Sequence, residues 1–340
     1  MKAATFILTL LAAVGGAASK ALSVPSTGTT PLRKEAAKKD IIIGSGAINP
    51  SFLDDPKFRA VLSKQFNSLS PENEMKWGFI HPSKDKYNWP LLDRLVDFAE
   101  GHNMLIKGHT LISSCCNPDY LLNMTDPIEF RAEMKNHIET IMHRYADKMN
   151  RWDVVTEGLE TMGGGLQDNI YKKVLGASYI PDAFRFARAA APKAKLFYNE
   201  NLVESMPNKR QELLEYVTGL LADGVPIDGI GLQMHITELP LVPGIITEIV
   251  NSYIPLGLEV AITEMDVHTL NDTLQTEIYG ATIAEALAAG ITDISFWGFT
   301  DKHLYTWVPG AKPLMFDEEY RPKGSFYATH SALEKFVHQH

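Results

Sequence analysis

The feature that most constrains the fold is a regular alternation of short apolar runs with amphipathic segments. The runs are rich in β-branched and aliphatic residues, which is typical of strands buried in a parallel sheet. The segments between them carry apolar residues at helical spacing. Strands are predicted at residues 41–47, 66–70, 104–111, 152–157, 195–199, 227–233, 258–264 and 291–297. Helices are predicted at residues 91–100, 130–148, 180–190, 210–222, 245–254, 276–289 and 326–340.

This alternation predicts a single (β/α)8 TIM barrel, because seven of the eight strands are followed by the kind of segment that would cover them. Residues 40–340 show no linker and no break in composition, so we assign them to one catalytic domain. An open doubly wound sheet is the structural alternative. Such a sheet is expected to carry a glycine-rich phosphate turn after its first strand, and Gly44-Ser45-Gly46 lacks the third glycine and the start of a helix.

The N-terminus indicates secretion. Lys2 precedes an apolar run, and small residues follow it, so residues 1–19 have the pattern of a secretory signal peptide and are too short for a membrane anchor. Residues 20–39 are rich in Ser, Thr, Pro and Lys, which predicts a flexible arm or pro-segment. Asn123 and Asn271 each begin an Asn-x-Thr glycosylation motif, which suits a secreted, extracellular protein.

Composition excludes two classes of partner. The formal net charge is -9 and no basic stripe is present, so we expect no nucleic-acid partner. No later apolar segment approaches the ~20 residues of a membrane helix, so we expect no membrane association. We expect a monomer. The only two cysteines, Cys115 and Cys116, are neighbours, and either free thiols or a vicinal disulfide would fit the sequence.

Two of the predicted strands end in a glutamate, Glu157 and Glu264. The carboxyl ends of barrel strands form the active-site face, so these side chains are predicted to face one another. Two carboxylates that flank a glycosidic bond serve as proton donor and nucleophile in a retaining enzyme when they lie ~5–5.5 Å apart, whereas ~6.5–9.5 Å implies inversion. A structural salt bridge is the alternative for either glutamate alone, and the pairing makes it less favoured.

Other polar and aromatic side chains fall at the same strand ends. They are Asn73, Lys76, His109, Asn199, Gln233, His235 and Trp297. Trp297 and Trp307 suit the apolar faces of sugar rings, and His235 could orient a carboxylate. We interpret His109, which lies inside an apolar strand, as a core residue. No His-Glu-x-x-His motif or spaced Cys/His cluster is present, so we expect no metal and no cofactor, and no Gly-x-Ser-x-Gly elbow indicates a serine nucleophile.

From about Ile41 to about Leu333 the chain resembles glycoside hydrolase family 10, the xylanase-type retaining β-glycosidases. The motifs that carry the resemblance are Pro71-Glu72-Asn73-Glu74-Met75-Lys76-Trp77, Gly108-His109-Thr110-Leu111, Arg151-Trp152-Asp153-Val154-Val155-x-Glu157, Gly229-Ile230-Gly231-x-Gln233-x-His235, Ala261-Ile262-Thr263-Glu264-Met265-Asp266, and Trp297-Gly298 with Asp301-Lys302. The resemblance implies Glu157 as acid/base and Glu264 as nucleophile. It also implies that Gln233 and His235 support the nucleophile and its sugar. Sugars on the non-reducing side would be held by Glu72, Asn73 and Lys76, with Trp297 and Trp307 as walls.

The sequence departs from the family pattern around the sugar that is cut. The family usually has Trp-His-Ser-Gln-Leu-Pro where this chain has Ser113-Ser114-Cys115-Cys116-Asn117-Pro118. Thr156 stands where an Asn normally precedes the acid/base, and Glu200-Asn201-Leu202 replaces the usual Asp-Tyr-Asn. The loop between Asp301 and Trp307 looks longer than usual. Smaller side chains should enlarge the pocket, and a larger pocket would admit a hexose.

We therefore expect a secreted retaining β-glycosidase that deglycosylates a plant saponin. This would be similar to the tomatinase branch of the family, which releases the oligosaccharide from α-tomatine. The alternative is an endo-1,4-β-xylanase acting on plant cell-wall xylan, and another hexose-linked β-glycoside is a further possibility. A hypothesis of a different class is a secreted sugar-binding protein without catalytic activity.

Overall fold

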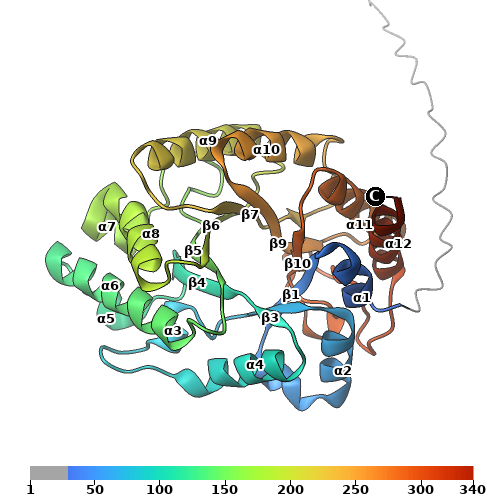
Figure 1. Ribbon diagram of the computed structural model, residues 1–340, viewed down its shortest axis with the longest axis horizontal. Coiled ribbons are helices and arrows are strands. Elements are labelled where there is room, and N and C mark those ends of the chain that lie inside the picture. The colour runs from blue at the N-terminus through green and yellow to red at the C-terminus, as the bar shows by residue number, and fades with distance from the viewer. Residues whose placement is uncertain (1–29, 340) are drawn as a thin grey trace, which may run out of the picture.

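The computed structural model describes residues 30–339, which form a barrel of parallel strands surrounded by helices (Figure 1). The predicted signal peptide and the first part of the predicted arm lie outside the described residues. The strands are β1 (Ile42–Ile48), β2 (Ser68–Pro71), β3 (Leu105–Ile106), β4 (Gly108–Ser113), β5 (Arg151–Thr156), β6 (Lys195–Glu200), β7 (Gly229–Leu232), β8 (His235–Ile236), β9 (Glu259–Val267) and β10 (Asp293–Phe296).

The strands pair in the order β3-β2-β1-β10-β9-β7-β6-β5-β4, with β8 added beside β9. Only Lys107 separates β3 from β4 along the chain, so these two short strands together occupy one strand position, which joins the two ends of this strand order. Counting β3 and β4 as one strand gives the eight strands of a (β/α)8 barrel, as the sequence predicted. All the strand pairs are parallel, so the carboxyl ends of all the barrel strands lie at the same face.

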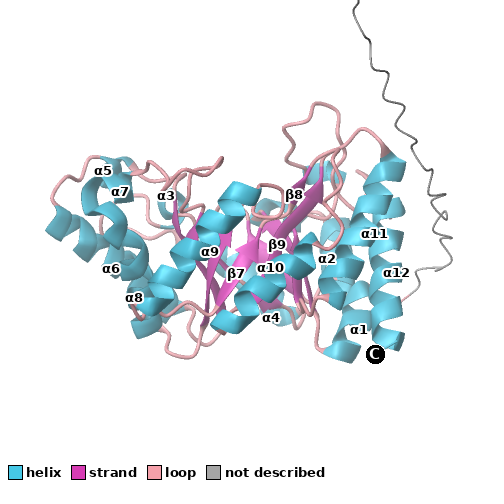
Figure 2. Cartoon of the chain, turned by 90° about the horizontal axis from the view of Figure 1, so that it is seen from above, coloured by secondary structure: helices cyan, strands magenta, loops and turns pink. Residues whose placement is uncertain are grey.

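The helices pack around the outside of the strands, as Figure 2 shows in a second view. They are α1 (Leu32–Ala36), α2 (Pro56–Gln65), α3 (Trp77–Ile80), α4 (Trp89–Gly101), α5 (Asp119–Leu122), α6 (Pro127–Arg144), α7 (Ile170–Leu175), α8 (Tyr179–Ala190), α9 (Pro207–Ala222), α10 (Ile245–Tyr253), α11 (Asp272–Ala288) and α12 (Gly324–Gln339). Local signals fix several helix starts. The Asp126 side chain, for example, accepts the amide of Ile128 at 2.8 Å, and Pro127 occupies the first position of α6.

The predicted flexible arm over residues 20–39 is wrong for its C-terminal part. Residues 32–39 form α1 and a short 3-10 turn (Ala37–Lys39), and Leu32 and Ala36 are fully buried. The amide of Leu32 also donates to Gln65 Oε1 at 3.0 Å, which ties α1 to the end of α2. Two apolar side chains at helical spacing therefore outweigh the polar composition of the surrounding segment.

The predicted strands and helices are otherwise confirmed to within a few residues, with two differences that matter for the site. The predicted strand 104–111 is split at Lys107. The predicted strand 258–264 continues to Val267, because β8 pairs with its last residues through His235–Asp266 and Ile236–Val267. Glu264 thus lies within β9 and not at its end. Among residues 30–339, no helix has the length and apolarity needed to cross a bilayer.

Candidate active site

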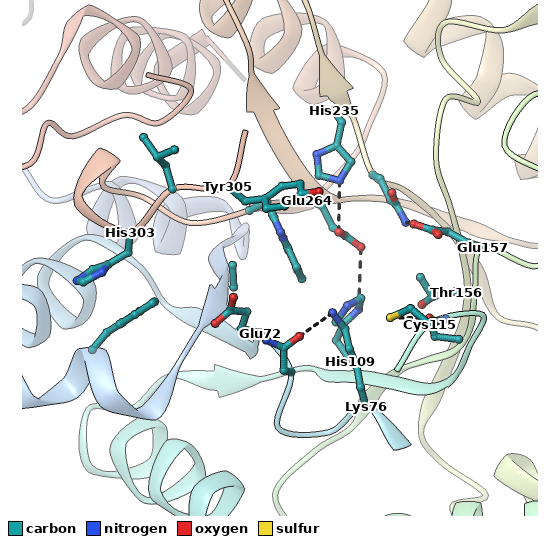
Figure 3. Close-up of a pocket in the computed structure, with 17 residues that line it drawn as sticks. Glu72, Lys76, His109, Cys115, Thr156, Glu157, His235, Glu264, His303 and Tyr305 are labelled. Atoms are coloured by element: carbon teal, nitrogen blue, oxygen red, sulfur yellow. Dashed lines mark hydrogen bonds and ion pairs between the residues drawn. The ribbon is translucent and has the colours of Figure 1, made fainter. Parts of the chain in front are cut away.

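A cavity of about 540 Å³ opens at the carboxyl ends of the strands (Figure 3). It is lined by Ala47, Phe52, Glu72, Asn73, Lys76, His109, Ser113, Cys115, Thr156, Glu157, Gln233, His235, Glu264, Trp297, His303, Leu304 and Tyr305. The structure therefore brings together both predicted catalytic glutamates and all the predicted sugar-binding residues except Trp307. Most of the side chains that line it are polar or charged, and they offer hydrogen-bond partners to a hydroxyl-rich ligand.

Glu264 is held in place by three neighbours at the base of the cavity. Its Oε1 accepts a 2.7 Å hydrogen bond from Asn199 Nδ2, and Thr263 Oγ1 fixes that amide by donating to Asn199 Oδ1 at 2.7 Å. His235 Nε2 lies 3.5 Å from Oε2, and His109 Nδ1 lies 4.0 Å from Oε1. Burial raises the pKa of Glu264, but the hydrogen bond from His235, the charge of His109 and the Asn199 bond together bring this pKa below its usual value. The carboxylate is thus kept ionised.

The His235 imidazole is oriented from behind by Asp266. His235 Nδ1 lies 2.8 Å from Asp266 Oδ1, which leaves Nε2 directed at Glu264. Burial lowers the pKa of His235, but the carboxylates of Asp266 and Glu264 outweigh burial and raise this pKa well above its usual value. The two carboxylates therefore favour the protonated form of His235.

His268 extends this network on the far side of Asp266, where its Nε2 lies 2.8 Å from the same Oδ1. The side-chain atoms of His235, Asp266 and His268 that could ligate a metal lie within 4.8 Å of one another, a spacing that could hold a metal ion. Both imidazoles already lie at hydrogen-bond distance from one carboxylate oxygen. We therefore interpret the trio as a network that orients the site.

Glu157 has a different setting, directly after β5 on the opposite wall. Its side chain is partly exposed, and its Oε1 accepts a 3.1 Å hydrogen bond from Gln233 Nε2. Its backbone has φ of 57°, a left-handed conformation that is uncommon for a residue with a side chain. Residues held in such conformations cluster at active sites, where the surrounding structure fixes the direction of the side chain.

The turn after Glu157 is fastened by a fully buried ion pair. Lys209 Nζ lies 2.9 Å from Glu200 Oε1, and Glu200 Oε2 accepts the amide of Leu159 at 3.1 Å. Burial raises the pKa of Glu200 to about 7, against the opposing effect of Lys209. Breaking a buried pair of this kind leaves an uncompensated charge, which is strongly destabilising. The pair therefore fixes the turn that follows Glu157 through the amide of Leu159.

The predicted sugar-binding residues before α3 lie together on one side of the cavity. Asn49 Nδ2 donates to Glu72 Oε2 at 3.1 Å, and Lys76 Nζ donates to Asn73 Oδ1 at 3.1 Å. Lys76 Nζ also lies 5.9 Å from the centre of the Trp297 ring. That ring packs over the backbone of Gly46, where an added Cβ would come within 2.9 Å of it. These contacts fix the donors and acceptors that would surround a sugar.

Two side chains differ from their predicted roles. Trp307 is not part of the cavity wall, and its ring instead stacks on His268 at 3.8 Å. His109, which we interpreted as a core residue, is buried but lines the cavity and bonds Asp153 Oδ2 at 2.9 Å through Nδ1. Its position in an apolar strand concealed this, because β4 has buried residues on both faces. In the sequence, the available signal was the place of His109 near the C-terminal end of the predicted strand 104–111.

The segment that departs most from the family pattern contributes only small side chains to the wall. Ser113 and Cys115 line the cavity, whereas Ser114 and Cys116 do not. Both cysteines are free thiols in the structure, and burial raises the pKa of Cys116 to about 11. Tyr171 OH donates to Asn117 Oδ1 at 2.6 Å, and Gly78 N donates to the Cys116 carbonyl at 2.7 Å. The segment is therefore fixed by contacts outside the cavity.

Comparison with known proteins decides the family. The model of the family described as Glycosyl hydrolase family 10 matches residues 32–332. The chain belongs to this family. It is 34% identical over 321 residues to endo-1,4-beta-xylanase B of Thermotoga neapolitana, covering 90% of this chain and 92% of that protein.

Solved structures agree with this assignment. Native xylanase 10B from Thermotoga maritima superposes with a TM-score of 0.86 at 36% identity, covering 91% of this chain and all of that one. Xylanase 10B from Thermotoga petrophila in complex with xylobiose gives a TM-score of 0.86 at 36% identity, covering 92% and 99%. This member of glycosyl hydrolase family 10 is therefore an O-glycosyl hydrolase with a (β/α)8 barrel.

Proposed function

We propose that the chain is a retaining endo-1,4-β-xylanase that acts on plant xylan. The observation that carries this proposal is the placement of Glu157 and Glu264 in one cavity with unlike surroundings, Gln233 on the first and Asn199 with His235 on the second. Unlike surroundings let one carboxylate stay ionised while the other carries a proton. The relatives described above are xylanases, so xylanase activity has better support than the saponin deglycosylation that we expected first.

In the first step the Glu264 carboxylate attacks the anomeric carbon as the glycosidic bond breaks. Glu157 gives its proton to the departing oxygen, which leaves as an alcohol, and the sugar becomes an ester of Glu264. In the second step Glu157 takes a proton from a water molecule, which attacks the same carbon and releases Glu264. Each face of the sugar is attacked once, so the anomeric configuration is retained.

A hexose-linked glycoside such as a steroidal saponin is a second candidate substrate. The observation that favours it is the small size of Ser113 and Cys115 on the wall, where the family resemblance leads us to expect bulkier side chains. A hexose has a hydroxymethyl group that xylose lacks, and such a group needs additional volume beside the ring. Thr156 lies on the same wall and donates to Thr110 Oγ1 at 2.9 Å.

One experiment tests both candidates. The protein is incubated separately with xylan and with α-tomatine, and the products are analysed by chromatography. Xylo-oligosaccharides without release of the tomatine aglycone would support the xylanase proposal and exclude the saponin. Aglycone release without xylo-oligosaccharides would support the saponin as substrate and exclude the xylanase proposal. Cleavage of no β-glycoside at all would favour a sugar-binding protein without catalytic activity.

The exchange of Ser113 for Trp together with Ser114 for His tests the volume argument directly. We expect the ratio of activity on aryl xylosides to activity on aryl galactosides to rise, because the larger side chains refill the space beside the sugar. An unchanged ratio would contradict the role given to this segment. The single exchange Ser114→His is the matched control, because Ser114 lies outside the cavity wall.

We also propose that the protein is secreted and glycosylated. The predicted signal peptide supports secretion, and Asn123 and Asn271 are both exposed, as acceptor sites must be. Asn271 also caps α11 by accepting the amides of Thr273 and Leu274 through Oδ1, at 3.1 Å each, which leaves its amide nitrogen for a glycan. Mass spectrometry of the protein from its natural culture medium, before and after glycosidase treatment, tests both points.

A further inference from the structure

The loop that follows β10 contributes an unexpected set of side chains to the cavity. His303, Leu304 and Tyr305 line it, whereas Trp307, two residues further on, does not. The sequence resemblance assigns a sugar-contacting role to Trp307 in this loop. The structure gives Trp307 a different environment.

Trp307 is 47% exposed and contacts the rings of two histidines. Its ring stacks on the ring of His268, with centroids 3.8 Å apart and planes at 29°. It also meets the ring of His235 edge-on at 5.7 Å and 87°. Both arrangements are favourable for aromatic rings, so they hold Trp307 in place.

His268 in turn fixes the loop on both sides of Trp307. The His268 side chain is fully buried, and its Nδ1 lies 2.9 Å from Thr306 Oγ1. The same hydroxyl accepts the amide of Val308 at 3.1 Å. Because His268 Nε2 also lies 2.8 Å from Asp266 Oδ1, the loop is in contact with the network around Glu264.

Tyr305 lies next to this anchor, with its ring tilted at 58° to the ring of Trp307. Its side chain is 67% exposed, and its ring is 6.3 Å from that of Trp307. Tyr305 lines the same cavity as Glu264 and His235, and Figure 3 labels all three. A large aromatic side chain that is exposed at the wall of a polar cavity is suited to cover the apolar face of a sugar ring.

We propose that Tyr305 is the residue of this loop that contacts the bound sugar, and that Trp307 and His268 are positioning residues that hold it there. The proposal rests on the proposed function, since it requires a glycoside in the cavity. It assigns to this chain a specificity-determining aromatic residue that the family motifs do not contain.

The test is a double-mutant cycle of Tyr305→Ala and Trp307→Ala, assayed on an aryl β-xylobioside. We expect Tyr305→Ala to raise KM about five- to tenfold with kcat changed less than twofold, because a stacking contact is lost in the ground state and the transition state alike. Tyr305→Phe should restore KM to within about twofold, since it keeps the ring. Trp307→Ala should raise KM in the wild-type background but add nothing to Tyr305→Ala.

Two outcomes would overturn the proposal. One is an unchanged KM in Tyr305→Ala, and the other is a Trp307→Ala effect that persists in full when Tyr305 is already absent. Leu239→Ala is the matched control, because Leu239 is 80% exposed and lies outside the cavity wall, so its KM should not change. Thermal melting of each variant identifies any that fail to fold.

The proposed function and this inference fail in different ways. If the wild-type protein does not hydrolyse the aryl glycoside, the proposed function is wrong. Calorimetric titration of xylotriose into wild type, Tyr305→Ala and Trp307→Ala then makes the same comparison through Kd. The same Kd in wild type and Tyr305→Ala, or no binding of xylotriose to wild type, would contradict the proposal that Tyr305 contacts the sugar.

Discussion

The two sides of the cavity are built in opposite ways. On the side of the proposed nucleophile, Glu264 is 5% exposed and lies within β9, where Asn199, His235 and His109 surround its carboxylate. On the side of the proposed acid/base, Glu157 follows the end of β5, is partly exposed and, among residues 30–339, has Gln233 as its one side-chain hydrogen-bond partner. A nucleophile must keep one charge state, whereas an acid/base must gain and lose a proton in each cycle. The buried setting of Glu264 suits a group that stays ionised, and the more open setting of Glu157 suits a group that exchanges a proton.

The largest effect is expected from Glu264→Gln. The change keeps the shape and the hydrogen-bonding reach of the side chain but removes the nucleophile, so kcat on xylan should fall by about 10⁴-fold or more. The loss should be of similar size for substrates with good and poor leaving groups, since neither can form the ester. Rates on xylan and on a dinitrophenyl β-xylobioside provide the measurement. Full activity with either substrate would exclude Glu264 as the nucleophile.

Glu157→Ala should give a smaller loss that depends on the leaving group. Proton transfer contributes roughly 10²–10⁴-fold to such reactions, so activity on xylan should fall by about that factor. Dinitrophenolate leaves without a proton, so formation of the ester from the dinitrophenyl substrate should be nearly as fast as in wild type. The pre-steady-state burst of phenolate measures that step. Equal losses on both substrates would contradict the division of roles between the two walls.

Asn199→Ala should have the smallest effect of the three and should alter the pH profile. The hydrogen bond that it removes goes to a charged group and is worth about 1.5–3 kcal/mol, which corresponds to roughly a 10- to 100-fold loss in kcat/KM. Asn199 helps to lower the pKa of Glu264, so its loss should raise that pKa. Glu264 must be ionised to act, and the acid limb of kcat/KM against pH should therefore move to higher pH.

The matched variant is Asn199→Asp, which has nearly the same shape and replaces a donor with a carboxylate. Like charge beside Glu264 should raise its pKa further than Asn199→Ala does. The acid limb should then lie at the highest pH of the three proteins. Identical acid limbs in all three would show that Asn199 does not tune the nucleophile.

The sequence predicted the barrel, and it predicted that Glu157 and Glu264 would meet in one cavity, because both depend on local patterns. Apolar runs that end in Glu157 and Glu264 are visible without any knowledge of packing, and the parallel barrel then brings strand ends to one face. The helical character of residues 32–36 was missed, since only two apolar side chains there are buried and their partner α12 lies at the other end of the chain.

Features that depend on how loops fold back could not be predicted. The sequence indicated that the loop after Asp301 is long, but it did not indicate that Tyr305 would line the cavity while Trp307 stacks on His268. His268 was not predicted as a site residue, because it lies just beyond the motif that contains Glu264 and Asp266. Its role appears only in the structure, where His235 lies on the other side of Asp266 and Thr306 of the later loop lies against His268.

The most direct test of the different roles proposed for Glu264 and Glu157 is to trap the ester between the sugar and the enzyme. An aryl 2-deoxy-2-fluoro-β-xylobioside with a good leaving group slows hydrolysis of the ester more than its formation, so the labelled enzyme accumulates. Peptide mass spectrometry should then find one disaccharide per chain, attached to Glu264, with a matching burst of the aryl alcohol. A label on Glu157, or inverted product with no label on an enzyme that turns over, would contradict the assignment of Glu264 as the nucleophile.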